Sequence, residues 1–126
     1  MAEGRLLVVD DEREITAVLE EHFRAAGYAV DVAHSGSDAL LMAAARRPDA
    51  VLLDVTMPPG PDGAEVLSRL RALDPTVAVV MLTGNGDVEL ARSLLRAGAF
   101  DYVPKPFELD VLERVVAAAT ALGRRA

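Results

Sequence analysis

The stretch VLLDVTMP, residues 51–58, does more than any other part of this sequence to decide the fold. Its first three residues are bulky and apolar, so a strand formed there would have no side that faces solvent. Strands buried on both faces are typical of parallel sheets covered by helices. Asp54 follows this strand directly, which places an acidic group at the carboxyl end of a buried element.

On both sides of this stretch, strand and helix patterns alternate along the chain. Short apolar runs predict strands at residues 6–9, 28–33, 51–53, 77–82 and 100–103. Apolar residues at helical spacing predict helices around 15–23, 35–46, 62–73, 87–96 and from 109 almost to the end of the chain. Five consecutive strand–helix units predict an α/β fold, a five-stranded parallel sheet with helices on both faces.

Two helix starts have polar residues at capping-box spacing. Ser35 precedes Asp38 by three residues, and Asp62 precedes Glu65 by the same interval. In such a pair the first side chain accepts a hydrogen bond from a backbone N–H in the first turn. We therefore expect helices to begin directly after Ser35 and Asp62.

Composition limits the classes of protein that this chain can be. Its 126 residues suit one domain, expected over residues 1–126 with a core at 3–122. A net charge of −7 without a basic cluster argues against direct nucleic-acid binding. The apolar runs are too short to span a membrane, and no secretory signal is evident. Together with the absence of cysteine, these features favour a cytoplasmic location.

Polar residues gather at the carboxyl ends of the predicted strands, where ligands bind in sheets of this kind. Asp10 and Asp11 follow the first strand, Asp54 ends the third, Thr83 follows the fourth and Lys105 follows the fifth. Three carboxylates about 4 Å apart would repel by several kcal/mol per pair, so a cation must offset them. Oxygen ligands of this kind suit Mg²⁺ better than zinc.

Lys105 is the only lysine in a chain that otherwise uses arginine. An ammonium is a compact point charge, whereas a guanidinium is a wider planar fork that prefers bidentate partners. The flanking Pro104 and Pro106 restrict the backbone on both sides, so the lysine is held in one direction. This pattern favours a single cation aimed at the acidic group.

Four motifs together resemble the receiver domain of bacterial two-component response regulators. They are VVDDE at 8–12, LLDVTMP at 52–58, MLTG at 81–84 and FDYVPKPF at 100–107. Each motif alone is weak, but four in order at successive strand ends are specific, and the match spans essentially the whole chain. The resemblance implies a CheY-like, flavodoxin-like, doubly wound fold with five helices and strand order 2-1-3-4-5.

The resemblance also implies a phosphoacceptor and a Mg²⁺ site. Asp54 would accept a phosphoryl group from a phosphohistidine, carried by a sensor histidine kinase or a phosphotransfer protein. Asp11 and Asp54 would bind Mg²⁺ directly together with the backbone carbonyl of Thr56, while Asp10 would act through water. The chain would not be an enzyme in the usual sense, since it would catalyse only its own phosphorylation and dephosphorylation.

The same resemblance implies a switch. Thr83 and Lys105 would contact the phosphoryl oxygens, and Tyr102 would turn inward as the Thr83 hydroxyl moves toward the phosphate. Alternatively, Tyr102 has no switching role and is a tyrosine partly buried at the edge of the sheet. Receivers commonly have a cis bond after this lysine, so we predict a cis Lys105–Pro106 peptide.

Phosphorylation would change the surface formed by the fourth helix, the fifth strand and the fifth helix. That surface would control an output domain or a target protein, and it is also the candidate face for a homodimer. The segment GAFDYVPKPF, residues 98–107, resembles the receivers of nitrogen-regulation transcriptional activators. The loop with Pro59, Gly60 and Pro61 is about one residue longer than the family pattern, which affects access to Asp54.

Other interpretations stay open at this point. The two acids at 10–11 could simply begin a helix, and Asp54 could belong to a stiff proline-rich turn. A Mg²⁺-dependent phosphatase of the haloacid-dehalogenase kind also uses an aspartyl nucleophile, but it needs a second Asp where this chain has Thr56. A flavodoxin-like cofactor carrier would cradle a phosphate in the loop after the first strand, where Asp10, Asp11 and Glu12 would repel it. The lone His22 and His34 suggest no metal site.

Overall fold

The computed structural model describes residues 4–55, 62–84 and 86–124. Strands and helices alternate through these residues as the sequence predicts. In chain order they are β1 (Arg5–Val9), α1 (Arg13–Ala25), β2 (Ala29–Ala33), α2 (Gly36–Ala45), β3 (Ala50–Asp54), α3 (Gly63–Leu73), β4 (Ala78–Gly84), α4 (Val88–Arg96), β5 (Asp101–Lys105) and α5 (Leu109–Arg124).

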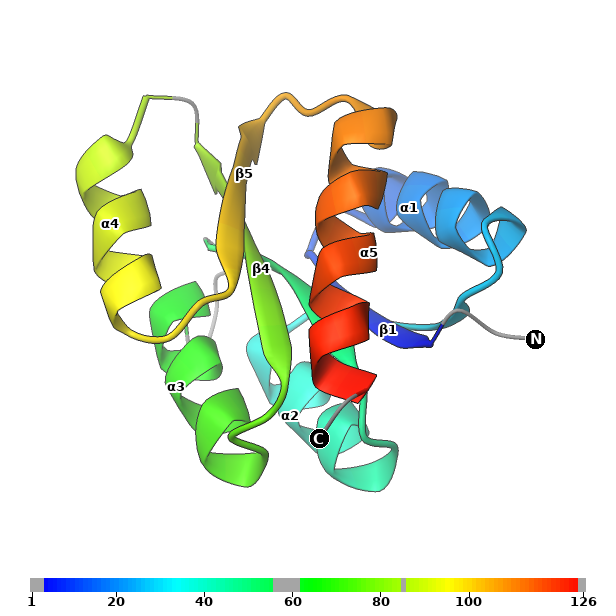
Figure 1. Ribbon diagram of the computed structural model, residues 1–126, viewed down its shortest axis with the longest axis horizontal. Helices are drawn as coiled ribbons and strands as arrows, with labels where there is room; N and C mark the ends of the chain where they lie inside the picture. The colour runs from blue at the N-terminus through cyan, green and yellow to red at the C-terminus, as the bar shows by residue number, and fades with distance from the viewer. Residues whose placement is uncertain (1–3, 56–61, 85, 125–126) are drawn as a thin grey trace.

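The strands form one parallel sheet in the order β2-β1-β3-β4-β5, which confirms the predicted fold class (Figure 1). β3 lies at the centre of the sheet, and every one of its residues is buried. The apolar composition of residues 51–53 therefore reflects helices on both sides of this strand. The order reverses between β1 and β3, which is where ligands bind in doubly wound sheets.

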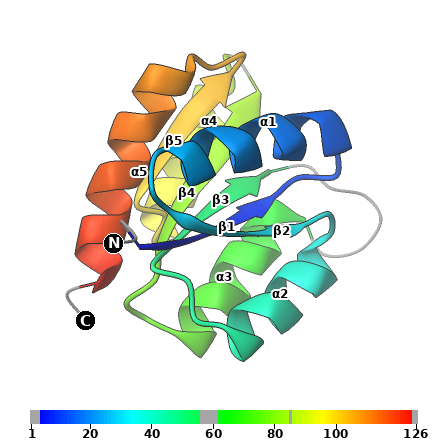
Figure 2. The same cartoon turned by 90° about the vertical axis from the view of Figure 1, so that its right-hand side faces the viewer.

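Helices cover both faces of the sheet. α1 and α5 lie on one face, and α2, α3 and α4 lie on the other (Figures 1 and 2). Alternate residues of a strand point to opposite faces. In β1, Leu6 and Val8 accordingly pack with the α1–α5 layer, whereas Leu7 and Val9 pack with the α2–α4 layer. Among the described residues, no helix has the length and apolar character needed to cross a bilayer.

The two predicted helix caps are present. The Ser35 Oγ accepts a hydrogen bond from the backbone N–H of Asp38 at 3.1 Å. A carboxylate oxygen of Asp62 accepts one from the backbone N–H of Glu65 at 3.0 Å. These bonds satisfy N–H groups that have no partner inside the helix. α2 and α3 consequently begin one residue after each cap.

The fourth and fifth strands extend further than the sequence predicts. The predicted strands end at Leu82 and Val103, but β4 continues through Thr83 to Gly84 and β5 to Lys105. Proline lacks an N–H and is normally read as the end of a strand. β5 is an edge strand, however, where a missing donor is tolerated. Lys105 therefore lies within the sheet, opposite Gly84.

A pair of leucine substitutions tests this assignment of the core. The Leu52 side chain in β3 is fully buried, whereas Leu122 in α5 is 50% exposed. We expect Leu52→Ala to lower the free energy of unfolding by about 2–5 kcal/mol because it leaves a cavity between the sheet and the layer of α1 and α5. We expect Leu122→Ala to cost less than about 1 kcal/mol. Urea unfolding followed by circular dichroism measures both, and equal losses would contradict the layered core.

Candidate functional site

The candidate residues lie at the carboxyl ends of four strands, along one edge of the sheet. Asp10 and Asp11 directly follow β1, Asp54 is the last residue of β3, and Lys105 is the last residue of β5. Thr83 is the penultimate residue of β4. Because all the strands are parallel, these carboxyl ends lie side by side. The strand ends that carry these residues are thus adjacent, as the predicted fold requires.

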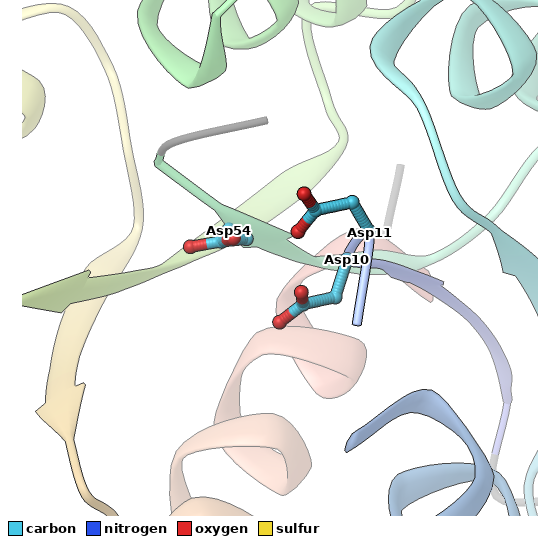
Figure 3. A group of neighbouring side chains, drawn as sticks. All are labelled: Asp10, Asp11 and Asp54. Carbon is cyan, nitrogen blue, oxygen red and sulfur yellow. The ribbon is translucent and has the colours of Figure 1, made fainter. Parts of the chain in front are cut away.

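The three aspartates form one acidic cluster. A carboxylate oxygen from each of Asp10, Asp11 and Asp54 lies within 4.8 Å of the others. Figure 3 shows the three side chains grouped where β1 and β3 end. Asp10 is fully buried and Asp54 is 7% exposed, whereas Asp11 is exposed to solvent. Burial increases the repulsion among these charges because less water screens them.

The Lys105 ammonium provides the positive charge that partly offsets this repulsion. Its Nζ lies 3.1 Å from Asp10 Oδ2, 3.3 Å from Asp54 Oδ1 and 4.0 Å from Glu12 Oε1. Burial disfavours the charged form, but the hydrogen bond to Asp10 and the charges of Asp54 and Asp10 outweigh it and raise the pKa of Lys105. The lysine therefore stays protonated throughout the neutral range.

Asp10 and Asp11 differ in what they contact. Asp10 Oδ2 accepts a hydrogen bond from Lys105 Nζ, and Asp10 Oδ1 accepts one from the backbone N–H of Glu12 at 3.0 Å. The backbone N–H of Asp10 donates to the carbonyl of Ala33 in β2 at 3.1 Å. Asp10 is thus fixed in place and its carboxylate is engaged on both sides. Asp11 presents its carboxylate at the open side of the cluster.

The composition of the cluster fits a hard divalent cation. Within the part of the chain that the structure describes, its donors are carboxylate oxygens, without the sulfur or imidazole ligands that zinc prefers. Three negative charges and the one ammonium leave two negative charges, which a divalent ion balances. Mg²⁺ is typically held by one or two carboxylates plus waters and phosphate oxygens. The residues present therefore fit Mg²⁺.

Thr83 and Tyr102 line the same hollow. Thr83 is 2% exposed and Tyr102 is half-buried. Both line a hollow of about 220 Å³ together with residues of the loop before α4. The Tyr102 ring also packs against the core layer that contains α4. Thr83 and Tyr102 are therefore neighbours, as a coupled pair would need to be.

The remaining predictions concern the Lys105–Pro106 bond, the loop after β3 and the two histidines. The Lys105–Pro106 peptide bond is cis, as predicted. Thr56 lies outside the described residues, and so does the longer loop at 59–61. Of the two histidines, His22 contacts Glu113 at 3.2 Å, and His34 contacts Thr16 at 3.1 Å. Neither contact resembles a metal site.

Gly63 is a site residue that the sequence analysis missed. Its backbone N–H donates to the carbonyl of Val55 at 2.8 Å. A Cβ at this position would lie 2.6 Å from the Cα of Val55 and 2.9 Å from the carbonyl oxygen of Asp54, which is too close for any side chain. The first turn of α3 therefore rests against the backbone that carries Asp54. A glycine directly after the Asp62 cap was the available signal.

Glu12 was also given no role at the site, although it is the third acid in the run that begins at Asp10. Its carboxylate is 63% exposed and reaches the outer side of Lys105 at 4.0 Å. An ion pair at that distance and exposure contributes little to stability. Glu12 does add to the negative potential at the entrance of the cluster.

This chain belongs to the response regulator receiver domain family, whose model matches residues 6–117. The fold and the acidic strand ends define it as a doubly wound protein whose acidic edge fits a cation. Response regulator MprA of Mycobacterium avium is 44% identical over 121 residues, which cover 96% of this chain and 51% of MprA. Regulatory protein AtoC of Escherichia coli is 40% identical over 119 residues, 94% of this chain and 26% of AtoC.

The solved structures agree with this assignment. The receiver domain of NtrX from Brucella abortus superimposes with a TM-score of 0.88 at 33% identity, over 92% of this chain and 98% of that one. The chain spans about half the length of MprA and about a quarter of AtoC. The matched part of these longer proteins is therefore equivalent to this chain, and the family assignment does not support the phosphatase alternative.

The charge imbalance in the cluster leads to a stability prediction. Asp54 is repelled by two carboxylates and attracted by one ammonium, so we expect Asp54→Asn to raise the free energy of unfolding by roughly 1 kcal/mol in chelator-treated protein at low salt. The exposed Glu21→Gln on α1 serves as the control and should have no effect. Urea unfolding at neutral pH measures the difference. A less stable Asp54→Asn protein would show that the cluster is not under repulsion.

Proposed function

We propose that this domain is a phosphorylation-dependent signalling switch in which Asp54 accepts a phosphoryl group from a phosphohistidine. The donor would be a sensor histidine kinase or a phosphotransfer protein. The observation that carries the proposal is the position of Asp54, at the end of β3, beside two further carboxylates and 3.3 Å from the ammonium of Lys105. Membership of the receiver family supports the same assignment.

In the transfer, a carboxylate oxygen of Asp54 attacks the phosphorus. A bond from that oxygen to phosphorus forms as the phosphorus–nitrogen bond breaks, and the electron pair of the broken bond returns to the histidine ring of the donor. The transition state spreads negative charge over the three equatorial oxygens, so positioning and nearby cations account for most of the catalysis. Lys105 already lies beside Asp54, and the Thr83 hydroxyl comes from the adjacent strand.

We assign the metal ligands from the contacts that the carboxylates already make. Both sides of the Asp10 carboxylate are engaged by Lys105 and the backbone of Glu12, so Asp10 would act through water. Asp11 and Asp54 would be the direct ligands, with the backbone carbonyl of Thr56 added by the resemblance alone. Bound Mg²⁺ would supply positive charge that offsets the carboxylates and the incoming phosphoryl oxygens.

The response to phosphorylation would pass through Thr83 and Tyr102. A phosphoryl group on Asp54 would add roughly −1.5 to −2 charge, by analogy with other phosphorylated side chains. Movement of the Thr83 hydroxyl toward that group would vacate part of the hollow that it shares with Tyr102. The ring could then turn inward and change the surface of α4, β5 and α5. That surface would act on an output domain or target protein, or pair two copies of the chain.

The domain would process only its own phosphoryl group, and it would not turn over other substrates. We take residues 1–126 as one receiver unit, with 3–122 as its core, whatever output follows in a longer protein. Direct nucleic-acid binding is not part of the proposal because the chain carries a net charge of −7. A relationship to nitrogen-regulation activators would concern the output rather than this chemistry.

Phosphorylation with a small-molecule donor tests the proposal. Wild-type protein incubated with acetyl phosphate and Mg²⁺ should gain the mass of one phosphoryl group, measured on the intact protein by mass spectrometry. Asp54→Asn should not gain it, because an amide nitrogen is a poor nucleophile. Replacing Mg²⁺ with a chelator should abolish the gain in the wild type.

Asp110→Asn is the matched control, since it removes a carboxylate that is 74% exposed on α5. It should be phosphorylated like the wild type. A mass gain that survives in Asp54→Asn would assign the acceptor to another residue. Sustained release of inorganic phosphate from a phosphomonoester would contradict the proposal that the domain is not a general phosphatase.

A further inference from the structure

The solvent-facing side of α2 is unusually apolar for a surface helix. Its ten residues include one charged side chain, Asp38. The exposed positions form a single stripe at helical spacing, made up of Ser37, Asp38, Leu41, Ala44 and Ala45. Helices on the surface of a globular protein normally place charged and polar residues on this side. The composition of the stripe indicates that something covers it.

An apolar groove runs beside this stripe, between α2 and α3. Its volume is about 620 Å³. Most of its lining is apolar, with one polar residue from α2 and one charged residue from α3: Ser37, Leu40, Leu41 and Ala44 from α2, and Arg69, Ala72 and Leu73 from α3. Leu41 is 70% exposed and Leu73 is 56% exposed. The same surface therefore carries both a groove and an exposed leucine that could fill the groove of another molecule. Contiguous exposed apolar surface of this kind marks interaction sites.

We propose that the α2–α3 face is a homodimer interface, in which a second copy of this chain packs its α2 antiparallel to the first. A two-fold axis near Leu41 would place Leu41 of each copy against the groove of the other. The small side chains of Ala44 and Ala45 would allow the two helices to approach closely. Such an interface uses the same patch twice, as two-fold dimers do.

The charges at the two ends of the stripe favour a second copy over an unrelated partner. Asp38 lies in the first turn of α2, and Arg46 is its C-terminal cap. In an antiparallel pair, Asp38 lies near Arg46 of the partner subunit, and this contact occurs twice. The Arg46 side chain contacts Asp31 at 3.4 Å, but it is still 66% exposed. It is therefore accessible to an acidic side chain of a second copy. The opposed helix dipoles add to the attraction.

This interface is separate from the surface expected to respond to phosphorylation. α2 packs on β1 and β2, whereas α4 packs on β5 at the other edge of the sheet (Figure 2). The pairing through α2 and α3 therefore does not need a phosphoryl group. Asp54→Asn should leave it unchanged, whereas pairing through α4, β5 and α5 would be lost in that variant. The two dimers are distinguishable on this basis.

Sedimentation equilibrium of the whole chain, from micromolar to millimolar concentration without a phosphoryl donor, tests the proposal. The wild type should show a reversible monomer–dimer equilibrium. Leu41→Arg should weaken dimerisation by at least about tenfold, because it places a charge in the apolar contact. Val18→Arg is the control, since Val18 is 52% exposed on α1, on the opposite face of the sheet. It should dimerise like the wild type.

A charge exchange tests the antiparallel arrangement. Asp38→Arg and Arg46→Asp should each weaken the dimer several-fold, and the double variant should recover most of the wild-type affinity. Circular dichroism of each variant at micromolar concentration checks that the monomer is folded. Leu73→Ser provides a second variant on α3 that should also weaken the dimer. A wild type that stays monomeric, or a dimer unaffected by Leu41→Arg, would overturn the proposal.

Discussion

The ammonium of Lys105, held between carboxylates from two other strands, is the interaction on which the site depends. It lies 3.1 Å from Asp10 and 3.3 Å from Asp54, so it ties β5 to the ends of β1 and β3. It also gives the buried carboxylate of Asp10 a cationic partner. One ammonium cannot balance three aspartates, and the remaining negative charge is the basis of the proposed divalent-cation site.

Much of the fold could be predicted because burial on both faces leaves a clear signal in the sequence. The apolar residues of β3 and the alternation with amphipathic helices lead directly to a parallel sheet. Parallel strands then bring their carboxyl ends together, so Asp10, Asp54 and Lys105 could be predicted to meet. The strand order itself came from the resemblance to receivers, since local patterns do not determine which strands are neighbours.

Several features depend on tertiary contacts that no local pattern encodes. Pro104 looks like a strand end, but its place on an edge strand lets β5 continue to Lys105. Gly63 is a site residue only because α3 approaches the backbone of Asp54. The apolar stripe around Leu41 could be read as helix core until the structure showed it to be exposed. In each case the spatial neighbour, rather than the residue type, decides the role.

Calorimetric titration of the metal-free protein with Mg²⁺ tests whether the acidic cluster is a cation site. If the surplus charge of the acidic cluster creates the cation site, the wild type should bind one Mg²⁺ ion, and both Asp11→Asn and Asp54→Asn should lose that binding. Lys105→Met should bind Mg²⁺ more tightly than the wild type, because the competing ammonium is gone. Binding that is unchanged in Asp11→Asn and Asp54→Asn, or weaker in Lys105→Met, would show that the surplus charge of the cluster does not create the site.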